Sequence, residues 1–121
     1  LEDLAVDKTS GAILAERVTA EKPLAMLCHA PAAVLAASDD ASTSPFAGFK
    51  MTGFSNVEEE QVGLAENAPW LLEDKLVELG VEYSSAAEPW GSHVVVDRNL
   101  YTGQNPQSSE ELAKRIVSDL G

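Results

Sequence analysis

The sequence predicts an α/β fold built on a mainly parallel sheet with helices on both of its faces. Short apolar runs alternate with helix-like segments along the chain, which is the pattern of such folds. One run, residues 24–27, is apolar without interruption, as expected for a strand buried on both faces. No strand is predicted before it, so we expect the visible strands to form the second part of a larger sheet.

The first elements follow from residue 9 onward. Residues 9–20 carry a rough helical stripe and end before Pro23, which cannot continue a helix. After the buried strand at 24–27, the Ala-rich segment 30–37 predicts a helix. Its Pro31 lies in the first turn, where the missing N–H does no harm.

The alternation continues in the middle of the chain. Residues 38–48 are rich in Ser, Asp, Thr, Pro and Gly and predict a surface loop before a strand at 50–54. A helix then begins at Asn56. The leucine spacing over 69–79 predicts a further helix that buries one face and ends at Gly80.

The last third of the chain predicts a hairpin and a final helix. A strand at 81–83 comes first, and the strands at 93–96 and 100–102 then flank a short turn. The final helix begins at Ser108, with Glu111 at the spacing of a capping box.

The composition limits the classes of function. The 121 residues contain 20 Asp and Glu against 8 Lys and Arg, a net charge of −12, which should repel nucleic acid and anionic membranes. A single cysteine fits a reducing compartment, so we expect a cytoplasmic protein, and no apolar run approaches the roughly 20 residues of a membrane helix. The two histidines show no ligand spacing, so we expect no metal and no other cofactor.

Residues 27–31 predict a nucleophile elbow, a tight turn from a strand into a helix. Such a turn presents its side chain, here Cys28, at the carboxyl edge of the sheet, where α/β proteins bind ligands. We expect the helix N-terminus to lower the pKa of the thiol from about 8.5 toward neutrality. We also expect the His29 backbone N–H to face a developing oxyanion, and the backbone of Cys28 to carry about 1 to 3 kcal/mol of strain.

Simpler interpretations stay open at this point. A lone cysteine is more often a small buried hydrophobe than a nucleophile, and His29 could be a surface imidazole at a helix start. Any of the glutamates at 58–60 could orient His29, but Asn56 and Glu59 have capping-box spacing, which favours a capping role for Glu59. His93 begins an apolar strand and is expected to be structural.

Several stretches together resemble the ThiJ/PfpI family, which has the flavodoxin-like, class I glutamine amidotransferase-like fold. They follow one another in the family's order and cover nearly the whole chain: residues 25–32, 52–59, 70–74, 93–97 and 102–109. They are similar to the branch of heat-shock chaperones and glutathione-independent glyoxalases. The resemblance implies that residues 1–121 are the C-terminal part of a single domain of this type.

The resemblance also implies roles for individual residues. Cys28 matches the family nucleophile, His29 the histidine beside it, and Glu59 the acid that orients the histidine. Glu58 takes that role if the register differs by one. A Gly-rich turn and a further glutamate of the family lie upstream of Leu1, so we expect an incomplete domain that lacks its N-terminal strands, needs that segment to be complete, and is inactive alone.

The implied activity is that of a glyoxalase III-like lyase, which converts a small 2-oxoaldehyde to the 2-hydroxy acid without glutathione or metal. Two alternatives remain: a stress chaperone or redox-sensing protein, and an amidase, peptidase or protein deglycase that uses the same thiol. A small aldehyde is therefore the expected partner, with no nucleic acid and no membrane. Homodimers are common in the family.

Overall fold

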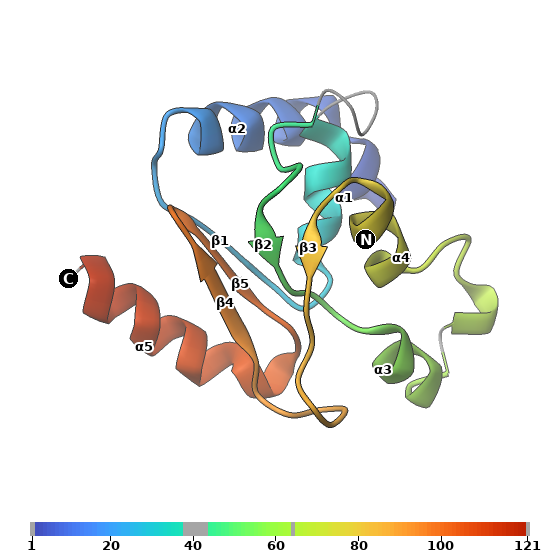
Figure 1. Cartoon of the computed structure of the whole chain (residues 1–121). Helices are drawn as coiled ribbons and strands as arrows, with labels where there is room; N and C mark the ends of the chain where they lie inside the picture. The colour runs from blue at the N-terminus through green and yellow to red at the C-terminus, as the bar shows by residue number, and fades with distance from the viewer. Residues whose placement is uncertain (1, 38–43, 64, 121) are drawn as a thin grey trace.

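The computed structural model describes residues 2–37, 44–63 and 65–120 (Figure 1). Its α-helices are α1 (Glu2–Val6), α2 (Lys8–Thr19), α3 (Asn56–Gln61), α4 (Leu72–Glu78) and α5 (Ser109–Leu120). Its 3-10 helices are η1 (Ala30–Ala37), η3 (Ala65–Asn67) and η4 (Pro106–Ser108). Its strands are β1 (Leu24–Leu27), β2 (Lys50–Met51), β3 (Glu82–Tyr83), β4 (Val94–Asp97) and β5 (Leu100–Gly103).

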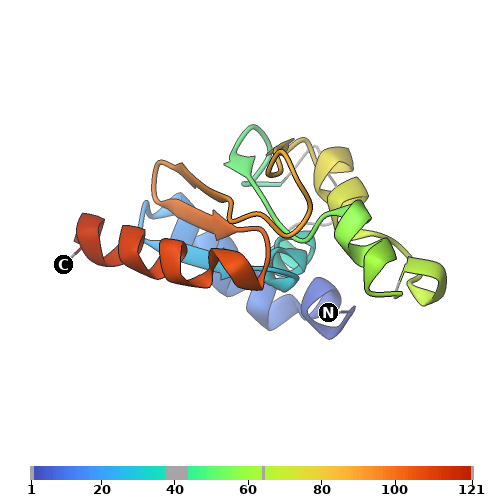
Figure 2. The same ribbon diagram turned by 90° about the horizontal axis from the view of Figure 1, so that it is seen from below.

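The described strands form a sheet of three and a sheet of two. In the first, β5 lies between β1, to which it is parallel, and β4, to which it is antiparallel. In the second, β2 and β3 are parallel. Helix α5 lies on one side of the three-stranded sheet, and η1, β2 and β3 lie on the other (Figures 1 and 2). The predicted α/β class with a mainly parallel sheet is therefore confirmed.

Helix α2 and η1 pack closely against each other and against β1. Asp7 caps α2 by accepting a hydrogen bond from the Thr9 backbone N–H at 3.1 Å. Gly11 is buried where α2 meets the backbone of Ala36, with no space for a Cβ atom. The predicted helix at 30–37 is present but is of the tighter 3-10 type.

A single hydrophobic core joins these layers. Its largest fully buried apolar side chains are Phe46, Met51, Leu72, Leu76, Leu100 and Val34. Residues 44–48 of the predicted loop form a turn, and residues 38–43 lie outside the described part of the chain. None of the described helices is long and apolar enough to cross a membrane.

Strand β2 is shorter than the predicted strand at 50–54 because its chain changes hydrogen-bond partners. The Thr52 N–H donates to the side-chain Oγ1 of Thr102 at 2.9 Å instead of to the backbone of a neighbouring strand. Two residues later, the Phe54 N–H donates to the Cys28 carbonyl oxygen at 2.9 Å. The chain therefore leaves β3 and runs past the end of β1, which places α3 beside the elbow.

The structure corrects the predicted start of one helix. Helix α4 begins at Leu72 and not at Pro69, which lies in a bend, although the helix ends before Gly80 as expected. Gly80 has φ +93°, a conformation that favours glycine after a helix.

The predicted capping box of the last helix does not form. The Ser108 hydroxyl accepts from the His93 N–H and donates to Asn105, while Glu111 accepts from the Ser92 hydroxyl at 2.7 Å. The turn η4 precedes α5 instead. The hairpin is confirmed, since Asp97 pairs with Leu100 across a two-residue turn.

Candidate active site

Cys28 lies in the turn between β1 and η1, as predicted, and its backbone is strained. Its φ is +62°, in the left-handed region that costs a residue with a Cβ about 1 to 2 kcal/mol. The Cys28 N–H donates to the Gly103 oxygen and its carbonyl accepts from the Phe54 N–H, each at 2.9 Å. Strand β5 and the segment after β2 therefore hold both backbone groups of Cys28, which offsets the strain.

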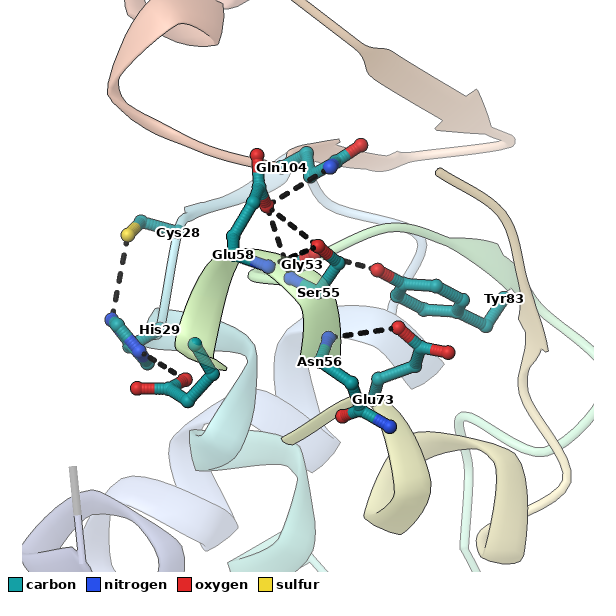
Figure 3. A network of polar contacts seen from close by, with 10 residues as sticks. Cys28, His29, Gly53, Ser55, Asn56, Glu58, Glu73, Tyr83 and Gln104 are labelled. Carbon is teal, nitrogen blue, oxygen red and sulfur yellow. Dashed lines mark hydrogen bonds and ion pairs between the residues drawn. The ribbon is translucent and has the colours of Figure 1, made fainter. Parts of the chain in front are cut away.

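The side chains of Cys28 and His29 point toward each other (Figure 3), and Glu59 continues this chain of contacts from the other nitrogen of the imidazole. The Cys28 Sγ lies 3.4 Å from His29 Nδ1, and His29 Nε2 lies 2.8 Å from Glu59 Oε2. The imidazole is 29% exposed, whereas the Glu59 side chain is only 7% exposed. The structure thus brings together all three residues for which the sequence predicts catalytic roles.

The carboxylate of Glu59 determines which nitrogen of His29 carries the proton. An ionised carboxylate only accepts hydrogen bonds, so Nε2 must be the protonated nitrogen of a neutral imidazole. The lone pair of Nδ1 then faces the Cys28 sulfur. In this arrangement His29 can accept the thiol proton.

The predicted lowering of the Cys28 pKa is wrong. Burial raises the pKa of the thiol above its ordinary value, and the negative charges of Glu58 and Glu59 act in the same direction. The His29 backbone N–H, which hydrogen-bonds the sulfur, lowers the pKa but does not outweigh burial. A raised pKa favours the protonated thiol, so a base would be needed to generate the thiolate.

The capping residue of α3 is Ser55 and not Asn56. The Ser55 hydroxyl accepts from the Glu58 N–H at 3.2 Å, and the Glu58 carboxylate accepts from the Ser55 N–H at 3.1 Å. This capping box leaves Glu59 available to His29, so the predicted pairing of Asn56 with Glu59 is wrong. Asn56 instead donates to α4 through its backbone and side chain, to Glu73 and Asp74.

The second histidine does not join this site. His93 Nε2 lies 3.0 Å from the Ser84 hydroxyl. Its backbone N–H donates to the Ser108 hydroxyl, and its carbonyl oxygen accepts from the Gln104 N–H. Within the described part of the chain, no group of three or more His, Cys, Asp or Glu side chains is placed to hold a metal ion.

The sequence did not point to Phe54 as part of the site. Its ring lies 4.3 Å from the imidazole of His29, tilted by 35°, and 5.4 Å from Trp90 in an edge-on arrangement. Phe54 therefore restricts the imidazole on one side. In the sequence, Phe54 stands out only by its position at the end of a predicted strand. An ordinary core residue can have the same position, so the sequence alone does not identify Phe54 as a site residue.

An α/β fold with a strained cysteine at a strand-to-helix elbow, backed by a histidine and a carboxylate, defines a class of candidate thiol enzymes. The model of the DJ-1/PfpI family matches residues 1–119, so the chain belongs to the DJ-1/PfpI family. This confirms the resemblance to the ThiJ/PfpI family.

The chain is similar to several known proteins of which it spans about half the length or less. It is 34% identical over 117 residues to the Bos taurus glutamine amidotransferase-like class 1 domain-containing protein 1, covering 97% of this chain and 53% of that protein. It is 31% identical over 99 residues to the Staphylococcus aureus protein/nucleic acid deglycase HchA, covering 78% of this chain and 33% of HchA.

Solved structures share the fold. The Francisella tularensis Rapid Encystment Protein superimposes with a TM-score of 0.89 at 36% identity, over 98% of this chain and 52% of that one. Glyoxalase III from Candida albicans superimposes with a TM-score of 0.76 at 24% identity, over 89% of this chain and 47% of that one.

Proposed function

We propose that the protein is a cysteine-dependent enzyme that converts small 2-oxoaldehydes to 2-hydroxy acids without glutathione. The observation that carries the proposal is the relay from Cys28 Sγ to His29 Nδ1 and from His29 Nε2 to Glu59. It supplies a nucleophile, a base in contact with it, and an acid that orients the base.

The first step forms a bond between sulfur and the aldehyde carbon. His29 Nδ1 takes the proton of Cys28 as the sulfur attacks, and the imidazolium then passes this proton to the aldehyde oxygen, which gives a hemithioacetal and restores the neutral imidazole. Because the pKa of the thiol is raised by burial, the attack needs this proton transfer. The imidazolium that forms is stabilised by the Glu59 carboxylate at 2.8 Å.

The second step moves a hydrogen between two adjacent carbons. His29 removes the proton from the former aldehyde carbon to give an enediolate, and it returns a proton to the neighbouring carbon. The product is a thioester of the 2-hydroxy acid on Cys28. Attack by water then breaks the carbon–sulfur bond, releases the acid and restores the thiol, so the net reaction adds one water to the oxoaldehyde.

We also propose that residues 1–121 are the C-terminal part of one domain that further chain completes. The fact that supports this is the length of the relatives, of which the chain spans about half. In this proposal the further segment pairs with the edge of the three-stranded sheet formed by β1, beside Cys28. Activity is accordingly expected of the whole protein.

Formation of lactate from methylglyoxal tests the proposal. Cys28→Ala should abolish turnover, and His29→Gln should reduce kcat by about 10²- to 10⁴-fold, as expected for loss of a general base. His93→Gln and Glu60→Gln are matched controls, because they remove the other imidazole and an exposed carboxylate of α3. Lactate production retained by the Cys28→Ala protein would exclude this scheme.

A protein deglycase is the second candidate, and the similarity to HchA favours it. The same thiol would attack the adduct that an oxoaldehyde forms with an amine or thiol of a protein. Release of the free amine from a glycated peptide, measured beside lactate formation from the free aldehyde, separates the two activities.

A further inference from the structure

Glu58 is a fully buried carboxylate that neither the proposed relay nor the fold class requires. It is 0% exposed, and it accepts hydrogen bonds from neutral donors only. The donors are the Ser55 N–H and hydroxyl, the Gln104 and Asn105 side-chain amides, and the Trp90 N–H, at distances from 2.7 to 3.1 Å. A protonated Glu58 would direct its own hydrogen at a donor, so the group is held as an anion.

The donors belong to three segments that are distant in sequence. Ser55 begins α3, Trp90 lies in the segment before β4, and Gln104 and Asn105 follow β5. The residue before Gln104 is Gly103, whose oxygen accepts the hydrogen bond of the Cys28 N–H. Glu58 therefore joins the start of α3 to Gln104 beside the elbow (Figure 3) and to the segment that carries Trp90.

Two paths lead from Glu58 to the imidazole of His29. The first runs along α3, since the capping box made by Glu58 sets the start of the helix that presents Glu59. The second runs through Trp90, whose φ of +67° is strained and whose N–H is held by Glu58 at 2.8 Å. The Trp90 ring packs on Phe54, and Phe54 packs on His29.

We propose that Glu58 is a positioning residue, which holds Glu59 and Phe54 against His29 and so keeps Nδ1 of the imidazole directed at Cys28. The inference rests on the proposed function. The direction of the Glu58 pKa agrees with it: burial alone would raise this pKa, but the amides of Gln104 and Asn105 and the backbone of Ser55 and Trp90 lower it below its ordinary value.

The test observes His29 directly and needs no substrate. The chain contains two histidines, so ¹⁵N-labelled protein gives two imidazole signal sets, and His93→Gln identifies the set of His29. In the unaltered protein, the His29 Nε2 proton should exchange slowly with water because it is hydrogen-bonded to buried Glu59. Glu58→Gln replaces the carboxylate by an amide of the same shape, whose NH₂ group faces the donors that the carboxylate accepted from. These hydrogen bonds are lost, so the His29 Nε2 proton should exchange about tenfold faster.

Glu60→Gln is the matched control, because it removes an exposed charge from the same helix and should leave the exchange rate unchanged. Glu58→Asp keeps the charge but shortens the side chain, and it carries the test where Glu58→Gln does not fold. It too should accelerate exchange. A folded Glu58→Gln or Glu58→Asp protein with an unchanged His29 signal would overturn the proposal, whatever the outcome of the lactate assay.

Discussion

The backbone strain at Cys28 predicts an unusual order of stability among substitutions. Replacement by alanine keeps the cost of φ +62°, about 1 to 2 kcal/mol, whereas glycine removes it. Glycine costs about 0.5 to 1 kcal/mol in additional entropy of the unfolded chain. Cys28→Gly should therefore be more stable than Cys28→Ala by roughly 0.5 to 1 kcal/mol, although glycine has the smaller side chain.

Equilibrium unfolding in urea, followed by tryptophan fluorescence, measures this difference. With a slope of about 1 to 3 kcal/mol per molar urea, the midpoint of Cys28→Gly should lie a few tenths of a molar above that of Cys28→Ala. Ala25→Gly is the matched control, since Ala25 lies in β1, the strand that leads into the elbow, is exposed and lacks a positive φ. It should lower the midpoint relative to the unaltered protein. An alanine variant as stable as the glycine variant would refute the assignment of strain to the elbow.

Two further predictions follow from close packing and from burial. Gly11→Ala should lower stability by roughly 1 to 3 kcal/mol, because its Cβ would meet the backbone of Ala36, and this outweighs the gain of about 1 kcal/mol in helix propensity; an unchanged midpoint of thermal unfolding would contradict it. Because burial raises the pKa of Cys28, the rate of its alkylation by iodoacetamide should reach half its maximum above the ordinary thiol pKa of about 8.5. A midpoint near neutrality would show instead that a thiolate–imidazolium pair exists at rest.

The elbow could be predicted from sequence because its signals are local. An unbroken apolar run, a cysteine, a histidine and a proline within eight residues define both the strand and the turn that follows it. These features depend on the order of residue types and not on how side chains meet.

Which glutamate contacts His29 depends on which residue caps α3, and residue spacing alone does not determine the cap. Adjacent residues on a helix point about 100° apart, so a shift of one residue in the cap exchanges the roles of Glu58 and Glu59. Both Ser55 and Asn56 can cap a helix, and the spacing of Asn56 with Glu59 favoured the wrong one. The structure selects Ser55 because Asn56 is engaged by α4.

The pKa of Cys28 could not be predicted from the motif because it depends on tertiary burial. A helix N-terminus and an adjacent N–H both favour a thiolate, and both are local features. The opposing effects come from distant parts of the chain: side chains that exclude water, and the carboxylates of Glu58 and Glu59 on α3. The local argument therefore had the wrong sign.

The raised pKa and the orientation of His29 together define how the site would work. A thiolate at rest would react with any passing oxidant or electrophile, whereas a thiol in contact with a neutral base reacts when a carbonyl is in place to receive the sulfur. The Glu59 carboxylate, which disfavours the thiolate, also lies 2.8 Å from His29 Nε2 and would stabilise the imidazolium formed at the moment of attack. The same negative charge thus suppresses the free nucleophile and stabilises the protonated base. Removing the Glu59 charge should accordingly make Cys28 easier to ionise while lowering kcat, two effects of opposite sign from one substitution.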